Sequence, residues 1–164
     1  MGSAVRSAPP NRVPMWRDEE VRAALLKASA KNEPPKVRQA AIGALCGLAC
    51  ADANKVPMWS FDPLKAALLD SAGLDAPPQV RTSALRALQN LASTPENMHT
   101  IWNDGVARAT LLSAASESEP QSVREVALRS LCELAHATSN LEPMWMDPKV
   151  KSILVLSAKV EQPP

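Results

Sequence analysis

Apolar residues recur along this chain at the spacing of an α-helix. In the range 35–51 they fall at i, i+4, i+8 and i+11, one face of a helix, and they are Val37, Ala41, Leu45 and Leu48. Equivalent patterns occupy 78–93 and 121–137, and alanine is abundant in all three ranges. The pattern therefore predicts three amphipathic helices that pack closely on their neighbours.

A longer period, of 43 residues, runs through the same chain. All four tryptophans follow it, with an asparagine five residues before each and a leucine nine residues after each. These columns are Trp16, Trp59, Trp102 and Trp145; Asn11, Asn54, Asn97 and Asn140; and Leu25, Leu68, Leu111 and Leu154. The period predicts three full units, 11–53, 54–96 and 97–139, and a partial fourth, 140–160.

Another helix is predicted directly after each tryptophan. An acidic residue opens it in every unit, where a carboxylate can cap free N–H groups: Asp18, Asp62, Asp104 and Asp147. Proline precedes the Met-Trp pair in three units, so we expect any helix ahead of the tryptophan to be short there: Pro14, Pro57 and Pro143. The sequence thus predicts two main helices per unit, with the fourth unit stopping before its second.

These helix pairs determine the expected fold. A pair with one apolar stripe cannot bury that stripe alone, whereas stacking against the next pair buries it. We therefore expect an all-α protein, a right-handed α-solenoid, with one domain over 11–160. Residues 1–10 and 161–164 are expected to be flexible ends.

Two segments resemble a known family of helical repeats. Residues 80–92 resemble the long third helix of armadillo repeats, and 96–112 resemble that family's short first helix, its hinge at Gly105 and its second helix. The resemblance covers roughly 11–158, and the period also fits HEAT repeats. It implies that the long helices line a concave groove, where an asparagine ladder holds an extended peptide in the peptide-binding armadillo proteins.

Groove positions can be read across the three units. They are Gln39, Gly43 and Gly47; then Thr82, Arg86 and Asn90; then Glu125, Arg129 and Glu133. The candidate partner-binding residues are Arg86, Asn90, Arg129 and Glu133, and Arg129 and Glu133, at i and i+4, are expected to neutralise each other. This mixed surface suits a polypeptide better than a polyanion.

The tryptophan and arginine columns each allow two interpretations. The tryptophans could form an exposed stacking ladder, but their identical recurrence favours packing between units. A column of Arg38, Arg81 and Arg124 could bind phosphate, but it sits at helix starts, where extra positive charge is not needed. We expect these arginines to bond loop carbonyls or nearby acids such as Glu33, Asp75 or Glu119.

Candidate chemistry is sparse. Cys46 with Cys50, and Cys132 with His136, place two potential zinc ligands on one helical face, but a unit with no ligands separates the two pairs. We therefore interpret them as small thiols rather than metal sites. No catalytic motif is present, and the sequence predicts no enzyme activity, cofactor or metal.

Composition narrows the functional classes. The net charge is +1 (18 Lys and Arg against 17 Asp and Glu), which disfavours nucleic acid as a partner. No apolar stretch approaches the roughly 18 residues of a membrane span, so we expect no membrane association. Three irregularly spaced cysteines favour a reducing, cytoplasmic compartment.

We therefore expect a non-enzymatic scaffold, adaptor or assembly subunit. It would bind a protein or peptide in the concave groove or at its uncapped ends, and the fourth unit could mediate self-association. Two alternatives remain at this stage: a HEAT-like nucleic-acid binder, and a regulatory repeat fragment of a longer multidomain protein.

Overall fold

The computed structural model describes the backbone of residues 11–159. Within that range the chain forms eleven α-helices and no strand, which confirms the all-α prediction. The helices are α1 (Arg12–Arg17), α2 (Glu19–Ala28), α3 (Pro35–Leu48), α4 (Asp52–Trp59), α5 (Asp62–Ala72), α6 (Pro78–Ala92), α7 (Pro95–Asn103), α8 (Gly105–Ala114), α9 (Gln121–Ala135), α10 (Thr138–Met146) and α11 (Pro148–Lys159). The ends expected to be flexible, 1–10 and 161–164, lie outside the described residues.

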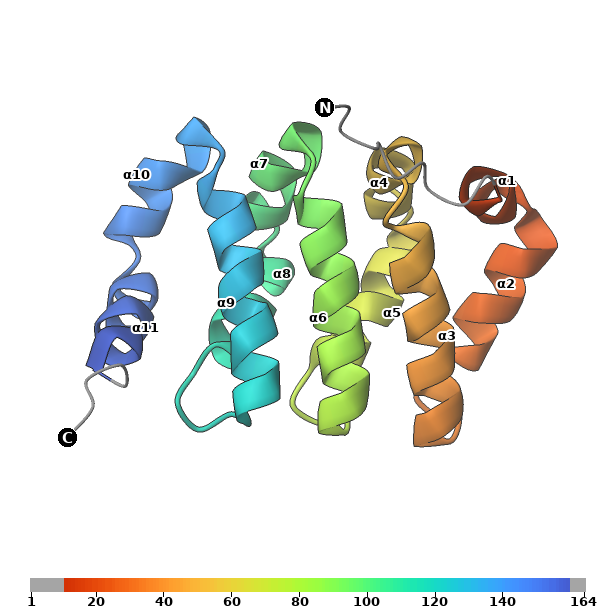
Figure 1. Ribbon diagram of the computed structural model, residues 1–164, viewed down its shortest axis with the longest axis horizontal. Coiled ribbons are helices and arrows are strands. Elements are labelled where there is room, and N and C mark those ends of the chain that lie inside the picture. Colours follow the sequence, from red (N-terminus) through yellow and green to blue (C-terminus); the bar gives the residue numbers. More distant parts are fainter. Residues whose placement is uncertain (1–10, 160–164) are drawn as a thin grey trace, which may run out of the picture.

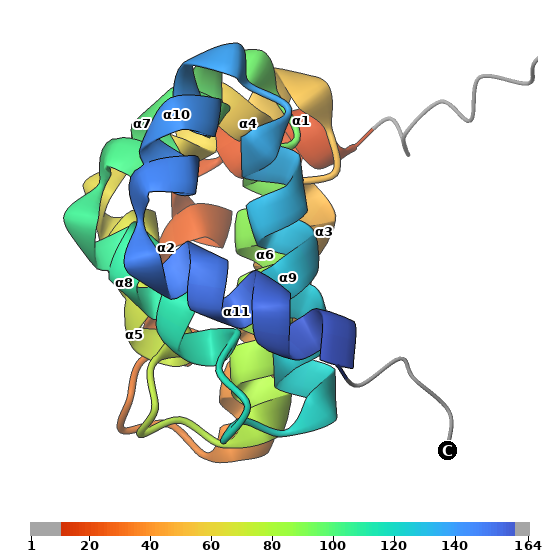
Figure 2. The same cartoon turned by 90° about the vertical axis from the view of Figure 1, so that its left-hand side faces the viewer.

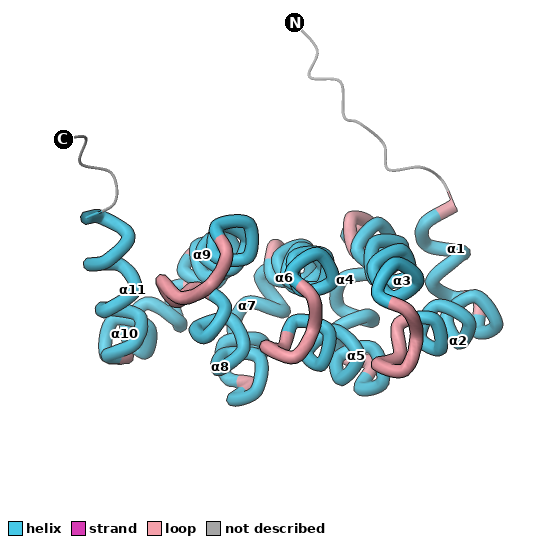
Figure 3. The backbone as a smooth tube through the Cα atoms, turned by 90° about the horizontal axis from the view of Figure 1, so that it is seen from below, coloured by secondary structure: helices cyan, strands magenta, loops and turns pink. Residues whose placement is uncertain are grey.

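The long helices form one layer of the molecule. Helices α3, α6 and α9 lie side by side, and α2, α5 and α8 lie behind them in a second layer (Figures 1 and 3). The short helices α1, α4, α7 and α10 lie at one end of the long ones, the top in Figure 1. Seen from the side, α10 and α11 cover one end of this arrangement (Figure 2). Segments that are far apart in sequence therefore meet where one helix of a layer lies beside the next.

The long helices match their predicted positions, but the short ones correct the expectation of two main helices. A helix also ends at or just after each tryptophan, so three kinds of helix alternate along the chain. They are the short helices α1, α4, α7 and α10; the middle helices α2, α5, α8 and α11; and the long helices α3, α6 and α9. Proline does not shorten α10: it has 9 residues with Pro143 inside, as many as α7. The proline removes a hydrogen bond to the Ser139 carbonyl, in the exposed first turn, where water can satisfy it.

Aspartate caps three of the four middle helices, as expected. Asp18 accepts a hydrogen bond from Val21 N at 3.1 Å, and Asp104 and Asp147 make equivalent contacts. The second position differs because α5 already begins at Asp62, with Phe61 as its cap residue. There Asp62 instead forms an ion pair with Lys65, at 3.6 Å.

The apolar core follows the long helices. Leu85, Leu88 and Leu91 of α6 are fully buried because α6 lies between α3 and α9. Helix α3 has a long neighbour on one side only, and Val37 at its start is 42% exposed, whereas Val80, at the same position of α6, is buried. Packing between neighbouring long helices is therefore what completes the core.

Candidate functional site

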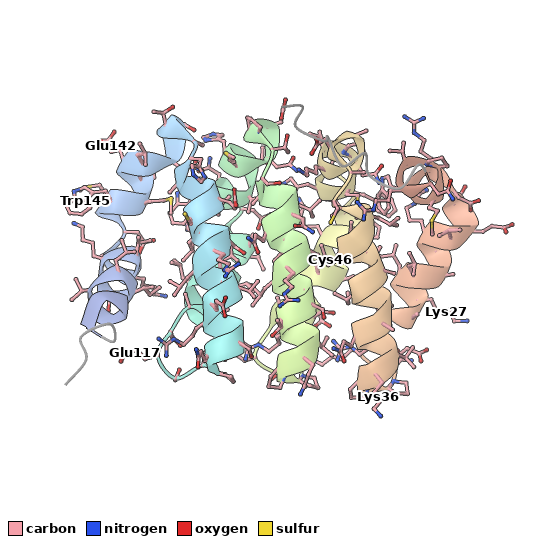
Figure 4. The ribbon with its side chains drawn as sticks, in the orientation of Figure 1. Lys27, Lys36, Cys46, Glu117, Glu142 and Trp145 are labelled. Carbon is pink, nitrogen blue, oxygen red and sulfur yellow. The ribbon has the colours of Figure 1, made fainter. Side chains whose placement is uncertain are left out.

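Three of the four tryptophans are buried and the fourth is not. Trp16, Trp59 and Trp102 are at most 5% exposed, whereas Trp145 is 66% exposed. The expectation that all four pack inside the array is therefore wrong for Trp145. Figure 4 shows this side chain on the outer side of α10, at the end of the molecule. The same residue type thus has two environments, set by whether a further helix covers it.

The environment of Trp16 shows how a tryptophan becomes covered. Its ring meets the edge of Phe61, 45 residues later in sequence, with ring centroids 5.8 Å apart. The guanidinium of Arg22 lies over both rings. A basic residue stands over the ring of each tryptophan from a position six residues later: Arg22, Lys65, Arg108 and Lys151. The sequence shows this column of basic residues, but we did not single it out.

An exposed apolar patch surrounds Trp145. We call it the end face, and it consists of Leu141, Trp145, Met146, Leu154 and Val155, each at least 49% exposed. The residues 43 positions earlier are buried in four of the five cases: Met98, Trp102, Leu111 and Leu112. Those residues belong to α7 and α8, which α10 and α11 cover. The end face therefore corresponds to the surface of α7 and α8 that α10 and α11 cover. Among the described residues, no helix covers the end face itself.

Buried asparagines join successive segments of the chain. The Asn97 amide donates to Leu91 O in its own neighbourhood, at 2.9 Å, and to Lys55 O, at 3.0 Å, 42 residues earlier. Asn54 and Asn140 make the same two contacts, with Leu48 O and Arg12 O and with Leu134 O and Met98 O. All three side chains are at most 2% exposed. Sequence reasoning noted the column but assigned it no role.

The arginine column differs from one position to the next. Arg81 Nη1 lies 2.6 Å from Glu119 Oε2, and both side chains are 6% exposed. Arg38 Nη2 lies 3.8 Å from Asp70 Oδ2 and 3.5 Å from Ser71 Oγ. The partners lie 32 to 38 residues later, so these contacts join segments that are distant in sequence. Of the acids expected as partners, Glu119 pairs with Arg81, and Asp75 pairs with Lys31 instead.

Arg124 completes the column without an acidic partner. Its Nε is buried and unbonded, and the side chain forms no hydrogen bond or ion pair with the residues whose side chains the structure describes. It lines a cavity of about 320 Å³ between α8, α9 and α11. This is the one position of the column at which the structure, as far as it is described, leaves the guanidinium unpaired.

The predicted groove residues lie together on the layer of long helices. Arg86, Asn90 and Arg129 line a cavity of about 220 Å³ with residues of α3 and α9. Arg129 pairs with Glu125 at 2.7 Å rather than with Glu133, which corrects the expected i, i+4 pair. Glu133 instead lies 3.7 Å from His136 Nδ1, one turn on. The i−4 and i+4 neighbours of Arg129 are both acidic, so sequence spacing alone could not choose between them.

Asn90 is held by Cys46 of α3 and by Cys50, which follows the end of α3. Its Nδ2 donates to Cys46 O at 3.2 Å and lies 3.4 Å and 3.2 Å from the sulfurs of Cys46 and Cys50. The pKa of the Cys46 thiol is raised from 9.0 to about 11, chiefly by burial and in part by Cys50, whereas Arg86 lowers it. Because the amide donors already have partners, Asn90 is not free to bind a peptide backbone as an asparagine ladder requires.

Searches of the described residues give two further findings. No group of three or more His, Cys, Asp or Glu side chains there could hold a metal ion. None of the helices described is both long and apolar enough to cross a bilayer.

Comparison with known proteins returned no relative. No family model matches the chain, and neither does a curated protein or a solved structure.

Proposed function

We propose that the chain is a right-handed α-solenoid of armadillo- and HEAT-like repeats that binds polypeptide partners and catalyses no reaction. Contacts that recur at a step of 43 residues support the repeat architecture, above all those of the buried asparagines and of the basic residues over the tryptophan rings. Each unit contributes a short, a middle and a long helix, and each covers the unit before it. A reducing compartment belongs to the same proposal, since Cys46, Cys50 and Cys132 are all free thiols.

The observation that carries the binding function is the end face. Its five apolar side chains are exposed together, and a contiguous exposed apolar patch is typical of an interaction site. The groove supports binding less well because Arg129 and Asn90 already have partners. We therefore place the primary binding surface at α10 and α11 rather than in the groove.

The partner is a helical hairpin, because that is what covers the equivalent surface one step earlier. Helices α10 and α11 lie on α7 and α8, and Asn140 donates to Met98 O across that contact. On the end face, Leu141 O occupies the position of Met98 O. A partner that packs there needs an apolar face and an amide donor for this carbonyl.

Trp145 fluorescence provides the test. The probe is a synthetic peptide that copies residues 95–115 with W102F, so that it has no tryptophan of its own. We expect a saturable blue shift of the protein's emission as the exposed indole becomes buried. Leu154→Asp should abolish the shift, and Val106→Asp, at an exposed apolar residue of α8 that is not part of the end face, should not. Equal loss in both variants, or no shift at all, would contradict the proposal.

A second copy of the protein is the other partner that could bind the end face, and it must be distinguished from a different polypeptide. Light scattering of the protein alone over a range of concentrations measures it directly. A mass that rises with concentration and stays monomeric in Leu154→Asp would identify a second copy as the partner. Nucleic acid is tested by a filter-binding titration at two salt concentrations, because phosphate contacts weaken steeply with salt.

A further inference from the structure

The unpaired Arg124 belongs to a pattern that includes a carboxylate partner. At Arg81 the guanidinium is held by the carboxylate of Glu119, from the loop between α8 and α9, and by Ala72 O at 3.3 Å. At Arg38 the partners are Asp70 and Ser71 at the end of α5. In both cases the group that neutralises the arginine comes from the segment that covers it.

The sequence supplies no such acid for Arg124. The positions that correspond to Asp70 and Glu119 are 156 and 162, and they are occupied by Leu156 and Gln162. Burying a charged group without a partner costs free energy, so buried charges are normally paired. The Nε of Arg38 is buried and unbonded too, so what distinguishes the half-buried Arg124 is that its guanidinium has no carboxylate partner among the described residues, which indicates a position that a partner group completes.

The cavity beside Arg124 has the chemistry of a carboxylate site. Lys149 and Arg124 both line it, as do the hydroxyl residues Ser113 and Ser152. Ile153 and Leu112 form an apolar wall suited to the methylene groups of a glutamate. Its volume of about 320 Å³ admits one side chain with part of its backbone, since small-ligand sites begin at roughly 300 Å³.

One acidic residue also lines this cavity. Glu117 is exposed, and its carboxylate makes no ion pair with Arg124 within the described part of the chain. Figure 4 shows Glu117 at the edge of the molecule, on the loop that leads into α9. Two basic groups therefore face one acidic group, which leaves the cavity positively charged.

We propose that the Arg124 cavity is a binding site for a glutamate carboxylate presented by a polypeptide partner, held by Arg124 and Lys149 as Glu119 is held by Arg81. A planar guanidinium matches a carboxylate in two parallel hydrogen bonds, which is why a carboxylate fits better than a single point acceptor. The inference rests on the proposed function, because the polypeptide that covers the end face is the one that presents the acid.

The test uses the loop that performs this role inside the protein. The probe is an acetylated and amidated peptide that copies residues 115–121 with E117Q, so that Glu119 is its one carboxylate. Binding is read from the Nε–Hε resonance of Arg124 in NMR spectra, assigned by its loss in Arg124→Gln. We expect a saturable shift of this resonance with the peptide. The E119Q peptide should bind about tenfold more weakly or worse, because a hydrogen bond between charged groups is lost.

Matched variants separate the possible outcomes. Arg129→Gln, which removes an exposed groove arginine, should leave the shift intact, and Glu117→Gln should strengthen binding by removing the neighbouring negative charge. No shift at Arg124, or an equal shift with the E119Q peptide, would overturn the proposal. So would an equal response to inorganic phosphate, which would indicate a site for free anions. A moved Arg124 resonance in Glu161→Gln without peptide would show that the chain's own acid occupies the site.

A stability comparison gives an independent check. Arg81→Met should lower the melting temperature because it leaves Glu119 buried and unpaired, whereas Arg124→Met should leave it unchanged or raise it. A similar loss in both variants would show that Arg124 already has a partner and would contradict the inference. This outcome is distinct from failure of the end-face experiment, which measures a different surface with a different peptide.

Discussion

Buried polar side chains join successive segments of this protein through specific hydrogen bonds. A primary amide has two N–H donors, so one asparagine can bond two carbonyls at once. Asn97 uses both, one on the end of α6 and one on α4. An apolar side chain of similar size would fill the space but would remove this donor from both carbonyls. The 43-residue recurrence of asparagine is therefore a consequence of backbone satisfaction between successive segments.

Replacing Asn97 by alanine tests this role. The change leaves Leu91 O and Lys55 O without their donor in a buried place, and we expect a loss of about 1–3 kcal/mol in the free energy of unfolding. Urea denaturation measures it. The control is Asn103→Ala on the same helix, where the side chain is exposed and the stability should barely change. Equal effects in the two variants would argue against the role.

The thiols offer a second residue-scale prediction. A thiol with a pKa of about 11 has about a hundredfold less thiolate at neutral pH than one with the ordinary value of 9.0, and the thiolate is the nucleophile. Cys46 should therefore react with maleimide more slowly than the exposed Cys132, as followed by mass spectrometry. Arg86→Gln should slow Cys46 further, because it removes the positive charge that lowers this pKa. Cys46 reacting as fast as Cys132 would contradict the prediction.

The burial of a long helix depends on which helices cover its two sides. Helices α3 and α6 share the same apolar spacing, yet Val37 is exposed while Val80 is buried. The difference comes from the neighbour on that side and not from the helix itself. Helix α3 also carries two glycines in its interior, and a Cβ added at Gly43 or Gly47 would meet nothing within 4 Å.

Gly43→Ala should therefore stabilise the protein. Glycine in a helix interior costs about 0.5–1 kcal/mol relative to alanine, and here the added methyl group has open space. We expect the urea midpoint to rise with no change in the slope of the transition. Gly73→Ala is the control, since its Cβ would lie 3.2 Å from Asp70 O and should gain less or lose stability. A lower midpoint for Gly43→Ala would show that something already packs against this position.

The middle of the row of helices and its ends differ in local stability. The main contacts of α6 are with α3, α4, α5, α7 and α9, whereas those of α11, within the described chain, are with α8 and α10. Regions with fewer buried apolar contacts open at lower free energy. The exposed residues of the end face and the unpaired Arg124 both lie at this less covered end.

Hydrogen exchange should show this gradient. We expect the amides of α6 to exchange most slowly and those of α10 and α11 to exchange much faster, because a row of helices is stabilised mainly by nearest neighbours. Mass spectrometry of peptic fragments measures the order. Uniform protection from α2 to α11 would instead indicate that the chain unfolds as one cooperative unit.

The sequence alone predicts the long helices and the helix that follows each tryptophan, but it does not predict all of the short helices. Periodicity located α3, α6 and α9 to within a few residues, because apolar spacing and flanking prolines are local signals. The acids that cap the middle helices were also visible, since a cap needs only the residues beside it. The resemblance to armadillo and HEAT repeats rests on such local patterns, and it stays a proposal.

Whether residues of the same 43-residue column share the same burial and the same partners depends on the tertiary structure. Trp59 and Trp145 both follow Pro-Met in the sequence, but Trp59 is covered by later helices and Trp145 is not. In the same way Arg81 meets Glu119 across two segments, whereas Arg124 meets no acid in the described chain. Burial and pairing depend on neighbours distant in sequence, and a local pattern contains no information about whether such a neighbour is present.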